Sequence, residues 1–337
     1  MVRQGVKGLT MTIGVLGAGA WGTALSLVAA DAGHSVTLWA READVVVDVN
    51  THHRNQLYLP GVALPHSIKA VDDLRALANS DIIILSVPTQ HIRSTLQGAT
   101  DIVAASILVD VSKGIERGTH LRVSEILDDI GAKSKAYVVL SGPSHAEEVG
   151  RRLPTAVVAA SSDATVSEYV QKALSTDTFR IYTSDDVIGV EICGALKNVI
   201  AIAAGIIDTM VESDNTKAAL LTRGLAEMMR LGVALGGQPA TFAGLAGLGD
   251  LFVTCTSRHS RNRSVGEQLG RGRTLSDILD DMTAVAEGVP TTTAALELAS
   301  TVGVDMPITA KVASILFEGE DPATALRDLM IRPYRAE

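Results

Sequence analysis

The sequence predicts an α/β fold of two domains, a doubly wound sheet followed by an all-α helical domain. Short apolar runs alternate with longer amphipathic ones from Thr12 to about Thr183, and the strand signal vanishes from about Asp185 onward. At 337 residues the chain has room for two domains that each bury a core. We therefore expect an N-terminal extension at 1–11, a first domain at 12–184 and a second domain at 185–337.

Seven short apolar runs in the first domain are typical of strands. They lie at 12–16, 35–40, 82–87, 106–110, 137–140, 155–159 and 180–182. Helix-like segments, such as 20–31 and 121–130, separate several of them. Strands that alternate with helices imply a mainly parallel sheet covered on both faces.

The second domain shows helical periodicity only. Its candidate helices lie at 185–208, 216–235, 264–269, 274–282, 291–301 and 308–317. Within the first of them, the run 192–204 is apolar on every face except for Lys197-Asn198, which predicts a buried helix. A buried ammonium is costly unless it is paired or used, and burial makes lysine a good general acid/base. Lys197 is therefore a catalytic candidate, although a structural pair capped by carbonyls would look the same.

Bulk properties exclude several classes of function. The net charge of −9 argues against a nucleic-acid binder or a protein that binds anionic membranes. The longest apolar stretch, 199–207, is too short to span a bilayer, and 1–11 has no apolar core typical of a signal peptide. The true start can be Met1 or Met11.

The two cysteines, Cys193 and Cys255, fit no metal spacing and no disulfide scaffold, so we expect a cytoplasmic protein without a metal. Because no base is adjacent, we expect both to be packing residues. His52-His53 and His66 lack partners at metal spacing and are expected at the surface.

A dinucleotide-binding fingerprint opens the first domain. The run Gly17-Ala18-Gly19-Ala20-Trp21-Gly22 matches G-x-G-x-x-G, follows an apolar strand and starts a helix, the context that makes this pattern specific. Gly17 allows a tight turn, Gly19 lets a pyrophosphate approach the backbone, and Gly22 permits close helix–strand packing. The helix N-terminus supplies N–H donors for the phosphates. The first domain is therefore expected to be Rossmann-like.

Cofactor selectivity is expected just past the second strand. There, no Asp or Glu occupies the strand tip, and Arg41 comes first, where it can stack on adenine or pair with a 2′-phosphate. NADPH is therefore favoured over strict NAD use, with a solvated surface arginine as the alternative.

Four further segments lie where a ligand site would form. Lys113-Gly114 and Gly142-Pro143-Ser144 each follow a strand, at the carboxyl edge where doubly wound sheets bind ligands. Gly249-Asp250 and Ser260-Arg261-Asn262 lie in the second domain, and the latter cluster at a helix start suits a phosphate. Taken alone, Asp250 can equally be a helix N-cap, and the Ser-Arg-Asn cluster a solvated loop.

With these segments in order, the chain resembles bacterial-type NAD(P)-dependent glycerol-3-phosphate dehydrogenase from Met11 to about Pro333. The motifs that carry the resemblance are the glycine-rich start through Leu25, Tyr58-Leu59-Pro60-Gly61, Lys113-Gly114, Gly142-Pro143-Ser144, Gly194-Ala195-Leu196-Lys197-Asn198, Gly249-Asp250-Leu251 and Ser260-Arg261-Asn262. Seven ordered motifs across both domains are far more specific than the glycine fingerprint alone.

The resemblance implies reversible reduction of dihydroxyacetone phosphate to sn-glycerol 3-phosphate, an oxidoreductase reaction on a CH–OH group that supplies phospholipid biosynthesis. It also implies a cytoplasmic homodimer. By resemblance, Lys197 is the general acid/base at the C2 oxygen, with Lys113 and Asp250 beside it. The implied substrate-binding residues are Lys113, Gly142, Ser144, Lys197, Asn198, Asp250, Ser260, Arg261 and Asn262. The implied cofactor-binding residues are Gly17, Gly19, Ala20, Trp21, Gly22, Arg41, Lys113, Ala146, Arg261, Val285 and Glu287.

Two residues depart from the family pattern. Ala20 replaces a serine that is common in the first loop, so a hydroxyl contact to the pyrophosphate is lost while backbone contacts survive. His145 stands where the family often has phenylalanine, which changes the lip of the pocket.

Two other functions compete with this one. A ketopantoate-type or other hydroxyacid reductase shares the two domains and the lysine, but its carboxylate substrate would not need the Ser260-Arg261-Asn262 phosphate seat. A regulatory protein that senses NAD(P) without turnover gives no reason for a buried Lys197 and Asp250.

Overall fold

The computed structural model describes residues 10–211, 213–282 and 285–333. Most of the predicted N-terminal extension, including Met1, lies outside the described residues, whereas Met11 lies within them.

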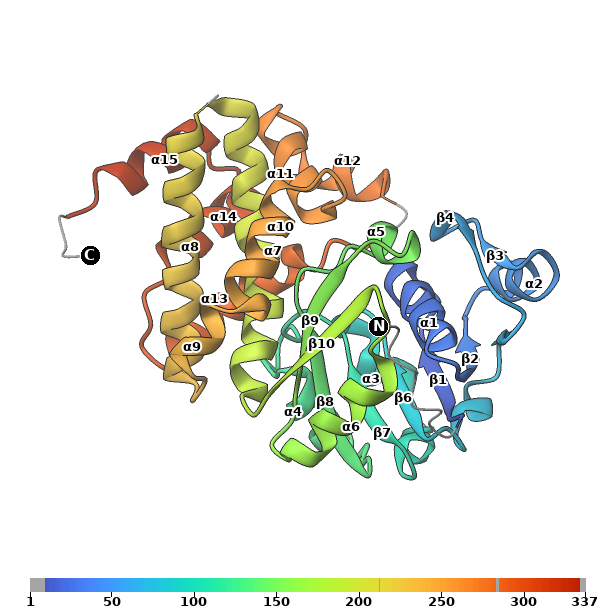
Figure 1. Ribbon diagram of the computed structural model, residues 1–337. Coiled ribbons are helices and arrows are strands. Elements are labelled where there is room, and N and C mark those ends of the chain that lie inside the picture. The colour runs from blue at the N-terminus through green and yellow to red at the C-terminus, as the bar shows by residue number, and fades with distance from the viewer. Residues whose placement is uncertain (1–9, 212, 283–284, 334–337) are drawn as a thin grey trace, which may run out of the picture.

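An eight-stranded sheet forms the N-terminal part of the described chain (Figure 1). Its order is β10-β9-β8-β7-β6-β1-β2-β5, and all neighbours are parallel except the antiparallel pair β8 and β9. The strands are β1 (Thr12–Leu16), β2 (Ser35–Trp39), β5 (Ile68–Val71), β6 (Ile82–Leu85), β7 (Ile107–Asp110), β8 (Ala136–Ser141), β9 (Thr155–Ala160) and β10 (Phe179–Ser184). The predicted mainly parallel sheet is confirmed, and each predicted strand coincides with an observed one.

Alternation along the strands divides the core into two layers. Val15 and Ile84 pack on one face with helices α1, α2 and α6, whereas their neighbours Leu16 and Leu85 pack on the other with α3 and α4. The helices of this part are α1 (Ala20–Asp31), α2 (Ala43–His52), α3 (Ile92–Leu96), α4 (Val123–Asp129), α5 (Ala146–Gly150) and α6 (Ala164–Leu174), with 3₁₀ turns η1 (Leu74–Leu77), η2 (Thr89–His91) and η3 (Thr100–Val103). Apolar residues on both strand faces therefore produce a sheet covered on both sides.

The sheet changes direction at β1. The chain adds β2 and β5 on one side of β1 and then returns to add β6 on the other side. Loops that leave the carboxyl ends of β1 and β6 therefore diverge and open a crevice, which is where doubly wound sheets bind ligands.

Three strands between 54 and 71 were not predicted. Strands β3 (Arg54–Asn55) and β4 (Leu59–Ala63) form a separate antiparallel pair, and β5 is the edge strand of the main sheet. Each of them is short, and β4 contains Pro60-Gly61, two residues that ordinarily disfavour a strand. Local sequence is a weak signal for such segments because their pairing partners supply the stability.

The C-terminal part is helical (Figure 1). Its elements are α7 (Val187–Met210), α8 (Asp214–Ala234), α9 (Pro239–Phe242), the π-helical η4 (Leu245–Gly249), α10 (Asp250–Thr256), α11 (Arg261–Gly270), α12 (Leu275–Asp280), α13 (Gly288–Thr301), α14 (Pro307–Ala313), the π-helical η5 (Ser314–Glu318) and α15 (Pro322–Met330). The last strand of the sheet ends at Ser184, and the first of these helices begins at Val187. The six predicted helices are each observed, whereas α9, η4, α10 and α15 in the described part of the chain were not predicted.

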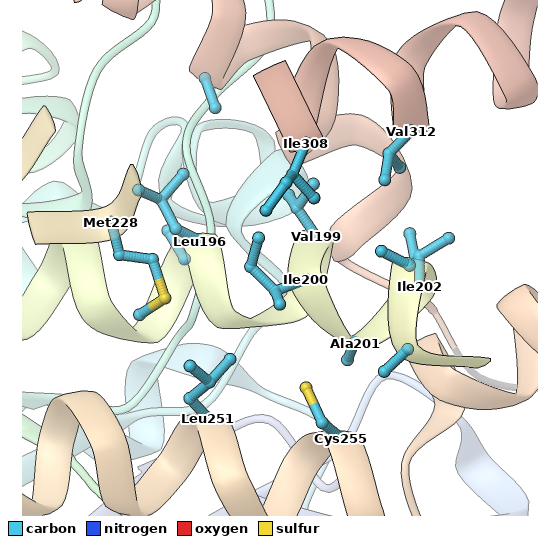
Figure 2. Packing of buried hydrophobic residues seen from close by; sticks show 14 of the residues in the cluster. Leu196, Val199, Ile200, Ala201, Ile202, Met228, Leu251, Cys255, Ile308 and Val312 are labelled. Carbon is cyan, nitrogen blue, oxygen red and sulfur yellow. The ribbon is translucent and has the colours of Figure 1, made fainter. Parts of the chain in front are cut away.

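Helix α7 is the axis of the helical part. Figure 2 shows its residues Leu196, Val199 and Ile200 packed between Met228 of α8, Leu251 of α10 and Ile308 of α14. The helix is long and apolar enough to cross a membrane by composition, yet its most apolar window is wholly buried within the protein. Burial by other helices and by the strands β8 and β9 accounts for its apolar composition, as predicted.

Candidate active site

The glycine-rich turn after β1 has a separate reason for each glycine. Gly17 has φ of +118°, and a Cβ there would lie 2.6 Å from the carbonyl oxygen of Ser86. A Cβ on Gly22 would lie 1.9 Å from the carbonyl oxygen of Gly17, so helix α1 can approach the turn only without a side chain. No atom lies within 4 Å of the Cβ position at Gly19, which leaves that backbone open to a ligand.

The start of α1 is built to donate hydrogen bonds. Gly19 is its N-cap, and no side chain caps the helix. The indole Nε1 of Trp21 is buried and has no acceptor among the described residues, a costly state for a donor unless a ligand supplies one. These groups fit the phosphates of a dinucleotide. Ala20, the first residue of the helix, leaves only backbone donors at its position.

Arg41 follows β2 and extends into solvent. Its side chain is 79% exposed and forms an ion pair with Glu42, with Nη2 2.9 Å from Oε1. Val285, another predicted cofactor contact, is also exposed.

Two lysines and one carboxylate form the centre of the site. Lys197 Nζ lies 2.5 Å from Asp250 Oδ1, and Lys113 Nζ lies 2.7 Å from Asp250 Oδ2. Lys197 comes from α7, Asp250 from the first position of α10, and Lys113 from the loop after β7. The structure thus brings the three predicted catalytic residues together, from both parts of the chain.

Lys197 is buried, with 6% of the residue exposed, as the apolar helix predicted. Burial, with help from the charge of Lys113, lowers the pKa of Lys197 to about 8, while Asp250 opposes the shift. Although Asp250 is buried too, the two lysine charges hold its pKa below the usual value. The centre therefore combines an ionised aspartate with a lysine that can exchange a proton near neutral pH.

Asp250 is not a helix N-cap, so that alternative is wrong. Gly249 occupies the N-cap position, and no side chain caps α10. The carboxylate of Asp250 is bonded to the two lysines instead, because α10 begins where α7 and the Lys113 loop meet.

A chain of amides fixes the framework around the lysines. Asn198 Nδ2 donates to the carbonyl of Lys113 at 3.1 Å, and Asn262 Nδ2 donates to Asn198 Oδ1 at 2.9 Å. The backbone N–H of Gly288 donates to Asn262 Oδ1 at 2.9 Å. Both amide hydrogens of Asn198 are therefore bonded within the protein, whereas one amide hydrogen of Asn262 has no acceptor among the described residues and can bind a ligand.

Glu287 joins α13 to the carboxyl edge of the sheet. Its carboxylate accepts hydrogen bonds from the backbone N–H groups of Thr89, at 2.6 Å, and Lys113, at 3.3 Å. Burial raises the pKa of Glu287, although the two hydrogen bonds act in the opposite direction and lower it. The residue predicted to touch the cofactor therefore holds the loops after β6 and β7, which border the crevice.

The loop after β8 closes another side of the site. Gly142 has φ of +147°, and its carbonyl accepts from Lys113 Nζ at 3.3 Å and from Ser144 Oγ at 2.8 Å. Ala146 is buried at the start of α5. His145 Nε2 is buried without a partner among the described residues, and its ring lies 5.9 Å from that of His259. Burial, reinforced by the charge of Lys197, lowers the pKa of His145, so this imidazole is neutral at neutral pH.

The Ser-Arg-Asn cluster forms the start of α11. Ser260 is its N-cap, and its Oγ accepts from the backbone N–H of Arg263 at 3.2 Å. Arg261 is exposed at the first helical position, whereas Asn262 is buried against Asn198. An arginine and an amide beside a capped helix start suit an anionic group.

Sequence reasoning missed three residues of the site. Thr254 Oγ1 accepts from Lys197 Nζ at 2.8 Å, Ser141 Oγ lies 3.4 Å from Asp250 Oδ2, and Thr89 bonds Glu287. Thr254 is four residues after Asp250, on the same helix face, and that spacing could have identified it. Ser141 ends β8, directly before the predicted Gly142-Pro143-Ser144 segment, which could have identified it, whereas Thr89 in η2 carried no distinguishing pattern.

The cysteines and the remaining histidines take no part in this centre. Both cysteines are buried, and burial raises the pKa of Cys193 well above its ordinary value and that of Cys255 to about 12, as expected for packing residues. His52 and His66 are exposed as expected, whereas His53 is partly buried and its ring meets that of His66 edge-on, with centroids 3.9 Å apart.

Comparison with known proteins gives consistent matches along the chain. Residues 12–167 match the family described as NAD-dependent glycerol-3-phosphate dehydrogenase N-terminus, and residues 186–327 match its C-terminus. A protein named glycerol-3-phosphate dehydrogenase [NAD(P)+] from Geobacillus thermodenitrificans is 54% identical over 96% of this chain and 96% of its own length. A protein of the same name from Chlorobium phaeobacteroides is 51% identical over 97% of this chain and 99% of its own length. A crystal structure of glycerol-3-phosphate dehydrogenase from Coxiella burnetii superposes with a TM-score of 0.91 at 39% identity, covering 96% of this chain and 99% of that one.

Proposed function

Since the chain belongs to the NAD-dependent glycerol-3-phosphate dehydrogenase family, we propose that it catalyses the reversible reduction of dihydroxyacetone phosphate to sn-glycerol 3-phosphate. It is an NAD(P)-dependent oxidoreductase acting on a CH–OH group. The observation that carries the proposal is the buried Lys197, held 2.5 Å from Asp250 at the carboxyl edge of a sheet whose glycine turn fits a dinucleotide.

The protein supplies the proton of the reaction. When bound, the reduced nicotinamide supplies a hydride to C2 of the substrate. Lys197 donates a proton to the C2 oxygen as negative charge develops there, which stabilises the transition state. Asp250 orients the ammonium of Lys197, and Lys113 adds a second positive charge on the same carboxylate. Thr254, one turn after Asp250 on α10, also accepts a hydrogen bond from Lys197 through its hydroxyl.

The phosphate of the substrate is proposed to bind at the start of α11. Arg261 supplies a positive charge, Asn262 its remaining amide hydrogen, and the capped helix start a favourable dipole. Ser260 positions this phosphate site by capping the helix. Gly142, Ser144 and Asn198 are proposed to line the rest of the substrate pocket. A carboxylate substrate, as in the ketopantoate-type alternative, would leave this seat without a partner.

The dinucleotide is proposed to bind along the glycine turn. Gly17, Gly19, Ala20, Trp21 and Gly22 would hold the pyrophosphate, and Arg41 the adenosine end, which favours NADPH over NADH. Lys113, Ala146, Arg261, Val285 and Glu287 would border the nicotinamide side. We further propose a cytoplasmic homodimer that supplies glycerol phosphate for phospholipid synthesis, in keeping with the family.

The direction of the pH dependence tests the role of Lys197. Because the pKa of Lys197 is lowered to about 8, oxidation of glycerol 3-phosphate, which needs the neutral amine, should accelerate as the pH rises through 8. Reduction needs the ammonium and should slow over the same range.

Lys197→Ala should lose roughly a hundredfold or more of the catalytic rate in both directions. The measurement is the absorbance of reduced nicotinamide with each substrate, as a function of pH, with NADPH and NADH.

Lys172→Ala, at an exposed position on α6, is the matched control and should behave like wild type. Cofactor binding by Lys197→Ala should persist. A wild-type protein that binds cofactor without oxidising it in the presence of dihydroxyacetone phosphate would overturn the proposed reaction. A flat oxidation rate between neutral and alkaline pH would overturn the assignment of Lys197 alone.

A further inference from the structure

Three side chains between the sheet and α7 form a hydrogen-bonded chain that the proposed reaction does not use. Asp110 ends β7, Tyr137 lies in β8 and Glu191 lies in α7. The hydroxyl oxygen of Tyr137 lies 3.1 Å from Asp110 Oδ2 and 2.9 Å from Glu191 Oε1. Both carboxyl groups are buried. One hydroxyl therefore contacts two acidic groups away from solvent.

A count of hydrogens shows that a proton is needed. The Tyr137 hydroxyl carries one hydrogen, so it can donate to only one of the two carboxyl oxygens. If both carboxyls were ionised, the Tyr137 oxygen would face one carboxylate oxygen with no hydrogen between them, and the lone pairs of these two buried oxygens would repel each other. A single additional proton on one carboxyl turns both contacts into hydrogen bonds.

Glu191 is the carboxyl that remains ionised. Arg122 of α4 donates to its Oε2, and Ser124 donates through its backbone N–H to Oε1 at 2.8 Å and through Oγ to Oε2 at 3.0 Å. With Tyr137, Glu191 thus receives four hydrogen bonds, one of them from a cation that also pairs with Glu125. Burial raises the pKa of Glu191, but the charge of Arg122 and these hydrogen bonds oppose that shift and favour the ionised form.

Asp110 is the carboxyl that holds the proton. Besides Tyr137, Ser112 is its only protein donor among the described residues, chiefly through the backbone N–H at 2.9 Å, and Asp110 has no ion pair within that part of the chain. The Ser112 hydroxyl is turned to the carbonyl of Val87 at 2.8 Å. Burial, reinforced by the charge of Glu191, raises the pKa of Asp110 to about 8.

We propose that Asp110 is a neutral carboxylic acid at physiological pH, that it donates its hydrogen to Tyr137, and that Tyr137 in turn donates to Glu191. This makes Asp110 a positioning residue. Its Oδ1 fixes Ser112, next to Lys113, while the chain through Tyr137 ends on α7 six residues before Lys197. The neutral acid thus ties the loop that carries one lysine of the site to the helix that carries the other.

Asp110→Asn mimics the neutral acid and provides the sharpest test. The asparagine oxygen can accept from Ser112 and its amide can donate to Tyr137, but the side chain cannot ionise. A carboxyl whose folded-state pKa is raised contributes stability that is full below the unfolded pKa of about 3.9 and is lost as the pH rises. Asparagine retains that contribution at all pH values.

We therefore expect the melting temperature of Asp110→Asn, relative to wild type, to increase from about pH 4 to about pH 8 and to level off above it. The corresponding change in the ratio of unfolding constants is about tenfold per pH unit. Asp128→Asn, at an exposed carboxyl on α4, is the matched control and should not show this trend. Glu191→Gln should be destabilised at every pH because it removes the charge that pairs with Arg122.

Infrared spectra supply an independent readout. Wild type at neutral pH should show the carbonyl stretch of a protonated, buried carboxyl, and Asp110→Asn should lack it. A melting difference that is constant with pH, or the absence of that band from wild type, would overturn the proposal.

Activity separates positioning from stability. Asp110→Ala should lose roughly tenfold in kcat, because Ser112 and Tyr137 each lose a buried partner, and Asp110→Asn should restore it. An asparagine variant as slow as the alanine variant would show that the ionised form is required and overturn the proposal. Only this activity readout rests on the proposed function; the melting and infrared measurements hold for a chain that fails to reduce dihydroxyacetone phosphate.

Discussion

At the residue scale, Asp250 decides how the two lysines of the site coexist. Two buried or half-buried ammonium groups repel each other, and one carboxylate placed between them, at 2.5 and 2.7 Å, offsets that repulsion. Asp250 therefore keeps Lys197 protonated when the substrate must be reduced, while burial keeps its proton exchangeable. A lysine on an exposed helix face would have neither constraint and would titrate far above neutral pH.

Arg41 offers a residue-scale prediction about cofactor choice. Its guanidinium is exposed after the end of β2 and is paired only with the neighbouring Glu42 among the described residues. An ionic bond to a 2′-phosphate contributes roughly 1.5–3 kcal/mol, so Arg41→Ala should raise KM for NADPH by about tenfold or more. KM for NADH should change little, which steady-state rates with both cofactors would measure.

The control for this prediction is Arg151→Ala, an exposed arginine just after α5. Equal increases of KM for both cofactors in Arg41→Ala would instead indicate that the arginine stacks on adenine, and would contradict its role in selecting NADPH.

At the element scale, α7 and α11 cross closely because glycine removes the side chains at the crossing. A Cβ on Gly205 of α7 would lie 2.0 Å from the carbonyl oxygen of Arg263, and one on Gly266 of α11 would lie 2.0 Å from that of Ile202. Backbone cannot yield as a flexible side chain can. This contact positions the start of α11, and hence Arg261 and Asn262, relative to Lys197.

Gly266→Ala should therefore separate the two helices. We expect a loss of about 1–3 kcal/mol in the free energy of unfolding, typical of an overpacked contact, despite the higher helix propensity of alanine. Thermal or denaturant unfolding measures this loss. KM for dihydroxyacetone phosphate should rise in the same variant because the phosphate seat moves with α11.

Ser264→Ala, two residues earlier on the same helix, is the control and should unfold like wild type to within about 0.5 kcal/mol. A stabilised Gly266→Ala would mean that helix propensity outweighs packing at this crossing.

At the scale of the whole molecule, the site exists only where the sheet and the helical part meet. Lys113 lies in the loop after β7 and Ser141 ends β8, whereas Lys197, Asp250 and Thr254 belong to helices. Glu287 crosses the same boundary, as does the chain from Asp110 to Glu191. Contacts between the two parts therefore control the geometry of the reaction as well as stability.

Glu287→Gln tests this coupling. A glutamine can accept from only one of the two N–H groups with its oxygen, and its own amide would face the other. We expect kcat/KM to fall by roughly tenfold, the effect of one buried donor left without a partner. Steady-state kinetics with wild type and Glu287→Gln would measure it.

Glu297→Gln, at a half-exposed carboxylate later on α13, provides the control, since its partner His120 lies in the loop before α4 and outside the site. An unchanged kcat/KM in Glu287→Gln would contradict the view that the loops after β6 and β7 depend on this carboxylate.

The sequence by itself determined the elements and the chemistry available. Apolar runs located the seven predicted strands because burial on both faces of a parallel sheet requires them, and the glycine spacing identified a turn whose φ of +118° at Gly17 only glycine adopts readily. The uniformly apolar helix around Lys197 predicted its burial, because an ammonium among apolar neighbours has no route to water.

The tertiary structure alone decided which groups meet. Edge strands such as β5 and short helices such as α10 carry little local signal because partners far along the chain stabilise them. Asp250 could be a helix cap or a lysine partner until α10 was placed against α7. The proton on Asp110 follows only from the position of Tyr137 between two carboxyl groups 81 residues apart in the sequence, since Asp110 and Glu191 meet only in the folded chain.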